Sequence, residues 1–326
     1  MTEQVHNNIY SIPVVLPDSP LKWLNSYYIP AADGGRALLV DTGFNRPECY
    51  DALLRGFDEL GVEPENTDVF ITHLHSDHAG NAPKLEALGC RVIMGALDYS
   101  LMGGDNWSRM RERALREGMS GEVAELVFSN NPATKYRPER FCAETVEDGD
   151  VLHRGGFGFE CICTPGHTPG HMCLYDREKR VFLSGDHVLF DISPNITCWS
   201  TMRDPLGSYI ESLRRVEELE VETALPSHRN CGSVTLAQRA AELIEHHARR
   251  LAELEELVRS RPGLTAYELT GLLKWRIRAR NWDEFPPAQK WFAMGEAMAH
   301  LDYLRLRGRV RSDDSSGQVV YFCNWR

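Results

Sequence analysis

The chain has 326 residues, a formal net charge of −11, and 42% hydrophobic and 25% charged residues. This composition excludes an intrinsically disordered chain, and the length is typical of about two domains. No stretch reaches the roughly 18 uninterrupted apolar residues of a membrane span, so we expect no membrane partner.

The N-terminal residues and the cysteines both indicate the cellular compartment of the protein. The sequence begins Met1-Thr2-Glu3-Gln4 and shows no basic region followed by an apolar stretch, which argues against a secretory signal. Its nine cysteines are an odd number without a C-x-x-C pair, unlike the pattern of a secreted disulfide scaffold. We therefore expect reduced thiols and a cytoplasmic protein.

Short strands alternate with turns and helices through the first 230 residues. Runs of β-forming residues predict strands at 37–40, 68–72, 91–94, 159–164, 180–184 and 223–226. Apolar residues at helical spacing predict a helix over 48–60, which Gly61 ends. Strands with interspersed helices indicate a layered α/β or α+β core.

Residues 104–140 interrupt this rhythm. A helical pattern covers 107–128, and the segment 130–138 is typical of an irregular loop. Such an insert is either a lid over a site or a peripheral decoration, and we favour the lid. Four of its apolar side chains could cover an acyl chain, namely Trp107, Met110, Leu126 and Phe128.

Beyond residue 235 the composition favours helices, so we divide the chain into domains 1–235 and 236–326. Helices are predicted over 236–258 and 288–307, and Thr265 with Glu268 forms a capping-box signature that opens a shorter helix between them. The segments 309–312 and 318–322 predict a hairpin. Three helices followed by a hairpin are typical of a winged helix.

The C-terminal part is also basic. From Gly271 to Arg326 there are ten Lys or Arg against six Asp or Glu, a local charge of +4, which leaves −15 on the preceding 270 residues. Such asymmetry can mark an end that binds nucleic acid. It is more often a solvated helical face, and we prefer that interpretation because arginine is common in helices.

Four side chains that can bind metal lie within six consecutive residues after a predicted strand. They are His73, His75, Asp77 and His78. Burying them unpaired would cost too much free energy, whereas a loop can direct the first two histidines at one point and the last two residues at a second. Imidazole and carboxylate suit zinc, iron or manganese. The segment therefore predicts a metal site.

His167, Asp186 and His228 are further candidate ligands, and each follows a predicted strand. A single histidine in such a position is more often a structural residue. Residues that can bind metal recur at several strand ends, and such a recurrence is improbable by chance. Together these residues indicate one shared metal centre.

The order of these motifs resembles that of the metallo-β-lactamase superfamily, and the tail is similar to that of its lactamase-beta-like branch. The matching motifs are His73-x-His75-x-Asp77-His78, Thr164-Pro-Gly-His167-Thr-Pro-Gly-His171, Gly185-Asp186, Pro226-Ser-His228 and the supporting turn Asp41-Thr-Gly43. The resemblance implies an α+β fold, in which an αββα sandwich over 1–235 is followed by a helical, winged-helix-like domain.

The resemblance also implies a set of ligands for two divalent ions, with zinc preferred over iron or manganese. One ion would bind His73, His75 and His167, a second would bind Asp77, His78 and His228, and Asp186 would bridge both. Asp41, His171 and His187 look like residues that orient the ligands, although ordinary packing explains His187 nearly as well.

The chemistry expected of such a centre is hydrolysis. Two ions lower the pKa of a shared water, so that a metal-bridged hydroxide, oriented by Asp77, attacks an electrophilic carbonyl. Asp186 stands where β-lactamases with a cysteine ligand carry that thiol, which disfavours penicillin hydrolysis. The expected substrate is a small acyl compound, a thioester or a lactone.

The alternative is a metal-dependent endoribonuclease acting on RNA phosphodiesters. It is suggested by basic residues of the tail beside Trp275, namely Lys274, Arg276, Arg278 and Arg280. The charge of −15 on the catalytic part would repel phosphate, so nucleic acid is the weaker expectation. We expect the tail to form a dimerisation surface or a wall of the substrate cleft, which leaves a homodimer open.

Overall fold

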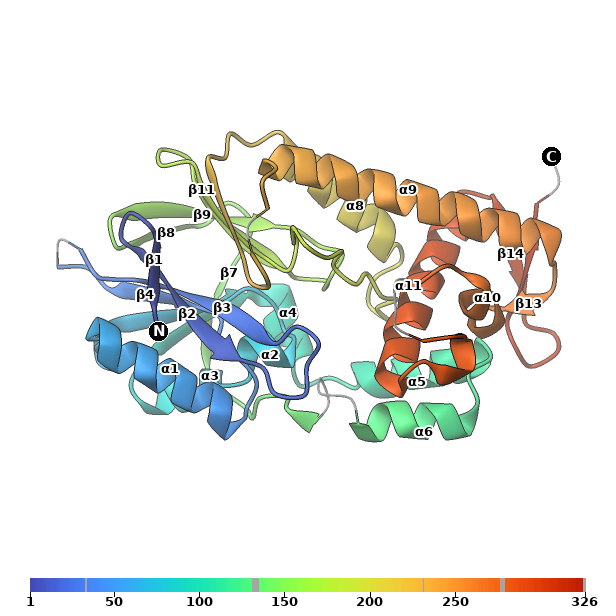
Figure 1. Ribbon diagram of the computed structural model, residues 1–326, viewed down its shortest axis with the longest axis horizontal. Helices are drawn as coiled ribbons and strands as arrows, with labels where there is room; N and C mark the ends of the chain where they lie inside the picture. The colour runs from blue at the N-terminus through green and yellow to red at the C-terminus, as the bar shows by residue number, and fades with distance from the viewer. Residues whose placement is uncertain (33, 131–134, 231, 276–278, 325–326) are drawn as a thin grey trace.

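Two β-sheets lie face to face and carry helices on their outer sides (Figure 1). The computed structural model describes residues 1–32, 34–130, 135–230, 232–275 and 279–324. Within these residues the first sheet has seven strands in sequence order, β1 to β7, and the second has five in the order β12-β11-β10-β9-β8. The predicted α+β class and αββα sandwich are confirmed.

Six of the twelve sandwich strands lie within two residues of their predicted positions. The first sheet consists of β1 (Glu3–His6), β2 (Ile9–Val15), β3 (Trp23–Ile29), β4 (Ala37–Val40), β5 (Thr67–Ile71), β6 (Arg91–Gly95) and β7 (Ala143–Val146). The second consists of β8 (Val151–Arg154), β9 (Phe157–Cys163), β10 (Met172–Asp176), β11 (Val181–Gly185) and β12 (Thr223–Pro226). Strands β1, β2, β3, β7, β8 and β10 were not predicted.

The space between the sheets is filled by apolar side chains from both inner faces. Phe70 of β5 and Ile93 of β6 belong to the same buried cluster as Phe159 of β9 and Leu183 of β11. Strand β5 is buried along its whole length, as expected of a parallel strand covered on both faces. Packing on both sides therefore fixes the end of β5, directly before the histidine-rich loop.

Helices α1 (Pro47–Leu60) and α3 (Ala82–Ala87) cover the outer face of the first sheet. Helix α1 packs Leu53 and Phe57 into one buried cluster with Ile12 and Val14 of β2. It ends at Gly61, whose φ of 63° lies in the left-handed region that favours glycine. The predicted helix over 48–60 is thus confirmed.

The other helices lie beside the first sheet (α2 and α4), in the insert (α5 and α6), and along the second sheet and the C-terminal region (α8 to α11). They are α2 (Ser76–Ala79), α4 (Ala96–Leu101), α5 (Asn106–Arg116), α6 (Gly121–Asn130), α8 (Pro205–Glu217), α9 (Leu236–Ser260), α10 (Ala266–Leu272) and α11 (Pro287–Leu306), with short 3-10 turns η1 (Pro64–Asn66) and η2 (Trp282–Glu284). Among the described helices, none has both the length and the apolar character needed to cross a membrane.

A third buried cluster joins the second sheet to the C-terminal region. It runs from Phe182 of β11 through Leu213 of α8 and Leu243 of α9 to Met298 of α11. Helix α9 extends from the sandwich across to the C-terminal elements (Figure 1). The two expected parts, 1–235 and 236–326, therefore share a hydrophobic core, and the boundary between them stays a prediction.

The helical pattern over 107–128 is confirmed, and the structure divides it into two helices. Helix α5 ends at Arg116, α6 begins at Gly121, and Gly118 between them has a φ of 99°. A Cβ on Gly118 would lie 2.4 Å from Thr265 Oγ1. The glycine between the two helices therefore allows the insert to pack closely against Thr265, the N-cap of α10. Periodicity within one window cannot reveal a contact with so distant a segment.

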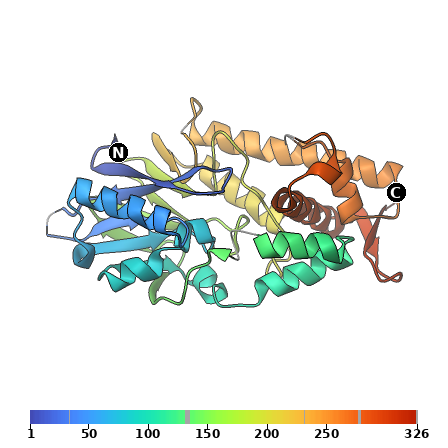
Figure 2. The same cartoon turned by 60° about the horizontal axis from the view of Figure 1, so that its bottom comes forward.

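The insert packs on the C-terminal helices, and α6 and α11 lie side by side (Figure 2). The rings of Phe128 and Trp291 meet edge to face with centroids 4.9 Å apart, and Trp107 lies 6.2 Å from the same indole. Residues 131–134 of the expected loop lie outside the described residues.

The C-terminal elements follow the predicted order. Strands β13 (Leu264–Thr265), β14 (Val310–Asp313) and β15 (Val320–Cys323) form a sheet in the order β13-β15-β14. Thr265 and Glu268 form the predicted capping box at the start of α10. The interpretation of this region as a winged helix stays a prediction, and Arg276 and Arg278 lie outside the described residues.

Candidate metal centre

The histidine-rich loop leaves the C-terminal end of β5 and enters the short helix α2. His75 is the N-cap of α2 and keeps an extended backbone, with φ −66° and ψ 147°. Asp77 and His78 already lie within α2. The change from extended to helical backbone explains how six consecutive residues present side chains to two neighbouring points.

The other candidate ligands lie at strand ends of the second sheet. His167, Asp186 and His228 follow β9, β11 and β12. Gly185, with a φ of 52°, precedes Asp186, and a Cβ there would lie 2.7 Å from His171 Nε2. Glycine thus permits a close approach of the chain behind the site. The fold brings all seven predicted ligand residues together at one edge of the sandwich.

Two sets of side chains face each other at this edge. Each set has its ligand atoms within 4.8 Å of one another, and the sets are His73, His75 and His167, and Asp77, His78 and His228. Asp186 lies between them, with Oδ2 3.5 Å from His167 Nε2 and Oδ1 3.5 Å from His228 Nε2. Each set could hold a metal ion, and Asp186 is placed to contact both.

Several atoms that point into the cluster are buried without a hydrogen-bond partner among the described residues. They are Nε2 of His78, His167 and His228, and Oδ1 of Asp186. Leaving such atoms unpaired costs about 1–3 kcal/mol each. Imidazole nitrogen and carboxylate oxygen are ligands that zinc, iron and manganese accept, so the residues present fit divalent metal ions.

The two sets differ in their electrostatics. Burial and the nearby His167 imidazole lower the pKa of His75 to about 3, which leaves its ring neutral and able to bind a metal. Burial raises the pKa of Asp77, but His78 and His228 outweigh it and bring the pKa to about 2. The pKa of His228 is raised, because the Asp186 and Asp77 carboxylates outweigh burial.

Three of the candidate ligands are oriented through their Nδ1 atoms. The pairs are His78 with Asp41 Oδ2 at 2.7 Å, His167 with the Asn195 carbonyl at 2.8 Å, and His228 with the Trp23 carbonyl at 3.0 Å. A proton on Nδ1 leaves Nε2 free to bind a metal. Asp41 was an expected orienting residue, whereas the two carbonyls were missed because a backbone group has no signature in the sequence.

His171 and His187 lie behind the ligands. His171 Nε2 accepts a hydrogen bond from the Asp186 N–H at 3.1 Å, and its Nδ1 lies 2.8 Å from Thr164 Oγ1. It therefore positions the backbone that carries Asp186. His187 packs between the rings of His171 and Tyr209, with centroids 6.1 and 5.3 Å away, and burial lowers its pKa to about 3.

Asp98 near the start of α4 is a buried residue that the sequence analysis missed. It accepts hydrogen bonds from the N–H groups of Leu74 and Gly170 and from the Thr168 hydroxyl. Burial raises the pKa of its carboxyl to about 6, although these three hydrogen bonds oppose the shift. An aspartate at the start of a helix is ordinarily an exposed N-terminal residue, so its sequence position gave no signal.

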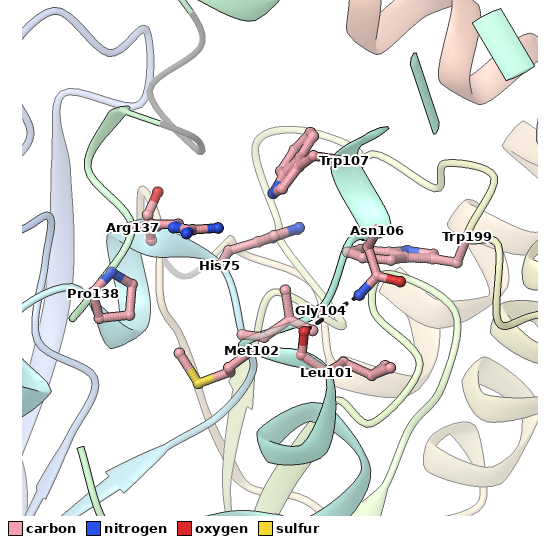
Figure 3. Close-up of a pocket in the computed structure, with 11 residues that line it drawn as sticks. His75, Leu101, Met102, Gly104, Asn106, Trp107, Arg137, Pro138 and Trp199 are labelled. Atoms are coloured by element: carbon pink, nitrogen blue, oxygen red, sulfur yellow. Dashed lines mark hydrogen bonds between the residues drawn. The ribbon is translucent and has the colours of Figure 1, made fainter. Parts of the chain in front are cut away.

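A pocket opens beside His75. Its walls include Leu101, Met102, Trp107 and Trp199, and the exposed Arg137 lies at its mouth. Figure 3 shows Arg137 to the left of His75 and Trp107 above it, with Leu101 and Met102 below. The pocket thus combines apolar walls with the polar side chains of Ser76 and Asn106 and the exposed cation of Arg137, and it borders one of the candidate ligands.

Only one of the four insert side chains expected over an acyl chain lines this pocket, and it is Trp107. Met110 is buried in the core that the insert shares with α11, Phe128 packs against Trp291, and Leu126 is exposed. The helical period placed these residues on apolar faces, but tertiary contacts direct them to the C-terminal helices. The role of the insert as a lid stays a prediction.

Residues 24–228 match the family model described as the metallo-beta-lactamase superfamily. The chain belongs to this superfamily. Residues 251–324 match a second model, described as the metallo-beta-lactamase-like C-terminal domain, which agrees with the branch that the tail resembles. The superfamily is one of metal-dependent hydrolases, and the centre described above contains His and Asp groups that could hold divalent ions.

Several relatives carry thioesterase names. The chain is 29% identical over 209 residues to an acyl-coenzyme A thioesterase, MBLAC2, of Gallus gallus, covering 60% of this chain and 69% of that protein. It is 25% identical over 231 residues to an atrochrysone carboxyl ACP thioesterase of Emericella nidulans, covering 71% and 59%. The chain spans between 39% and 67% of the length of the fungal relatives that it matches.

A solved structure matches almost the whole chain. The metallo-beta-lactamase family protein TTHA1429 from Thermus thermophilus superimposes with a TM-score of 0.82 at 28% sequence identity, covering 98% of this chain and all of the other. The sandwich and the C-terminal region described here are therefore shared as one arrangement by both proteins.

Proposed function

We propose that this superfamily member hydrolyses acyl thioesters with a dinuclear metal centre. The proposed ligands are His73, His75 and His167 for one ion, Asp77, His78 and His228 for the other, and Asp186 as the bridge between them. The observation that carries the thioester assignment is the pocket bordering His75, where Leu101, Met102 and Trp199 offer apolar surface that an acyl group could contact. The names of the thioesterase relatives support the same substrate class.

Bound divalent ions, with zinc as the first choice, would supply a hydroxide nucleophile at neutral pH and stabilise the negative charge that develops on the carbonyl oxygen. The chain itself orients the reactants. The Asp77 carboxylate, with its pKa of about 2, stays ionised and can accept a hydrogen bond from the attacking water. Trp199 and Met102 line the space where the acyl group would lie.

The leaving group also favours a thioester. An ordinary thiol has a pKa of about 8.5, so a thiolate can depart near neutral pH without a strong proton donor. Arg137 at the mouth of the pocket is an exposed cation that could attract phosphate groups of a thiol carrier such as coenzyme A. A lactone could use the same pocket, but it makes no use of this cation.

The decisive experiment is a substrate panel on the purified full chain with its metal content measured. Acyl-coenzyme A thioesters, thioesters of a neutral thiol, lactones and RNA are compared, and we expect the thioesters to be cleaved fastest with close to two metal ions per chain. Asp186→Ala should abolish turnover and reduce the metal content while the far-ultraviolet circular dichroism stays unchanged.

A matched control is Asp191→Ala, which removes an exposed carboxylate five residues away and should leave turnover intact. If lactones are hydrolysed faster than thioesters, the proposed substrate class is wrong, but the proposed dinuclear centre stands. RNA cleavage that falls steeply with salt, without thioester turnover, would support the endoribonuclease instead. Fully active protein free of metal would contradict the dinuclear centre.

A further inference from the structure

Asp98 is a fully buried carboxylate with three hydrogen-bond donors and no ion pair to a Lys, Arg or His of the described chain. Its Oδ2 accepts from the Leu74 N–H at 3.0 Å and from the Thr168 hydroxyl at 2.6 Å. Its Oδ1 accepts from the Gly170 N–H at 2.6 Å. Burying a carboxylate without a cation costs stability, so this arrangement calls for a functional reason.

The three donors all belong to the loops that carry one set of candidate ligands. Leu74 lies between His73 and His75, and Thr168 directly follows His167. Gly170 approaches so closely that a Cβ there would lie 2.5 Å from the Asp98 nitrogen. A single carboxylate thus ties the loop after β5 to the loop after β9 at the point where the three-histidine set is assembled.

The other set is served by a different buried aspartate. Asp41 Oδ2 accepts from His78 Nδ1 at 2.7 Å and from the hydroxyl of Ser227, the neighbour of His228, at 3.1 Å. Neither of these donors contacts Asp98. Asp41 also accepts from the Thr72 hydroxyl at 2.9 Å, and that hydroxyl lies 3.0 Å from His73 Nδ1. Asp41 therefore serves both sets, whereas the three donors to Asp98 lie beside ligands of the three-histidine set.

We propose that Asp98 is a positioning residue for the metal site formed by His73, His75 and His167, holding their two loops at the spacing that the ion requires. The inference rests on the proposed dinuclear centre. It predicts that loss of the Asp98 carboxylate weakens one of the two metal equivalents selectively, because residues that orient ligands contribute about 10- to 100-fold in metal affinity.

The test measures zinc affinity by competition with a chromophoric chelator, so that it does not depend on turnover. Two ligand variants isolate the sites: His228→Ala leaves the three-histidine site intact, and His75→Ala leaves the other. We expect Asp98→Asn to weaken the remaining equivalent about 10- to 100-fold in the His228→Ala background. In the His75→Ala background it should change that affinity less than about two-fold, because the three hydrogen bonds to Asp98 come from Leu74, Thr168 and Gly170 and none from Asp77, His78 or His228.

A matched control separates positioning from general stability. Asp68 is equally buried but is paired with Arg36, Arg91 and Arg154 at the start of β5, and Asp68→Asn should lower stability without changing zinc affinity. Thr168→Val removes one of the three hydrogen bonds with little change in shape. Should Asp98→Asn fail to fold, Thr168→Val must still weaken zinc binding in the His228→Ala background alone.

Equal weakening of zinc binding in both backgrounds, or none in either, would overturn the role of Asp98 while leaving the proposed function intact. Absence of zinc binding by the unaltered chain would instead overturn the centre itself and this inference with it. Loss of thioester turnover with normal zinc binding in Asp98→Asn would likewise refute positioning.

Discussion

The imidazole of His75 and the indole of Trp199 are stacked, with ring centroids 5.9 Å apart and planes inclined by 27°. The indole N–H also donates to the carbonyl oxygen of His167 at 2.9 Å. This buried ring is at the same time a wall of the pocket. Position 199 therefore links the three-histidine set to the space proposed for the acyl group.

Substitutions at Trp199 should distinguish the contribution of its hydrogen bond to His167 from that of its ring as a wall of the pocket. Trp199→Phe keeps a ring against His75 and loses a hydrogen bond worth about 1 kcal/mol, so we expect the KM for a long-chain acyl thioester to change less than about two-fold. Trp199→Ala also removes the pocket wall, at a cost of about 3–5 kcal/mol in stability, and should raise that KM by about ten-fold. Steady-state kinetics with metal-loaded protein checks this, and a larger KM change in the phenylalanine variant would contradict it.

Arg137 should govern the preference for anionic thiol carriers. We expect Arg137→Gln to raise the KM for acyl-coenzyme A by about three- to ten-fold, because an exposed cation at a pocket mouth attracts phosphate, and to leave thioesters of a neutral thiol unaffected. The difference should vanish near 1 M salt, where the screening length is about 3 Å. Arg140→Gln is the matched control, since Arg140 is an exposed arginine of the same segment. Equal effects on both thiol carriers would contradict an electrostatic role.

Trp291 should hold the insert and the tail together. Its side chain is 2% exposed and packs against Phe128, so Trp291→Ala should destabilise the fold by about 3–5 kcal/mol and make the insert more susceptible to limited proteolysis. The neighbouring Phe292 is 38% exposed, and Phe292→Ala should cost less than about 1 kcal/mol. Urea denaturation of both variants gives the comparison, and similar losses would show that the insert does not depend on this contact.

Glu296 on α11 should make stability depend on pH. Burial raises its pKa to about 7, although Arg250, 3.4 Å away, opposes the shift. Between pH 4.5 and 7 the unfolded chain has already released this proton while the folded chain retains it. The stability associated with Glu296 is therefore present below about pH 4.5 and is lost as the pH rises through about 7.

The variant Glu296→Gln replaces the protonated acid by a neutral group of similar shape. Relative to this variant, the unaltered chain should lose about 2–3 kcal/mol in its free energy of unfolding between pH 5 and pH 8. Urea denaturation at several pH values measures the difference. The two proteins have the same candidate metal ligands, so the titration of those ligands contributes equally to both and cancels in the comparison. Parallel stability curves for the two proteins would refute the assignment.

The sequence was most informative where chemistry is concentrated. The run from His73 to His78 and the isolated His167, Asp186 and His228 were all predicted as ligands because imidazoles and carboxylates at strand ends are otherwise hard to explain, and the structure brings them to one edge. The resemblance supplied the layered fold that places those strand ends together. Asp41 was also found, because it lies in a recognisable glycine turn.

What the sequence missed depends on contacts between distant segments. Asp98, Trp199 and Arg137 each look like an ordinary residue in its own neighbourhood, and only the folded chain brings them to the loops or the pocket. The break at Gly118 was missed for the same reason, since its cause is Thr265. The strands β1 to β3 were missed because Pro13 and the polar residues of that region weaken their β pattern.

The contact of Trp107 and Phe128 with Trp291 has a consequence for how such proteins diverge. These rings come from an insert and from a tail, yet they fill one space, so the size of each limits the sizes that the others can take. Natural selection then acts on the two segments as a pair: a smaller residue at one position creates a cavity that a larger residue at another must fill. A substitution in the insert that reshapes the pocket beside His75 would thus require a compensating change in α11, although no α11 residue lines that pocket.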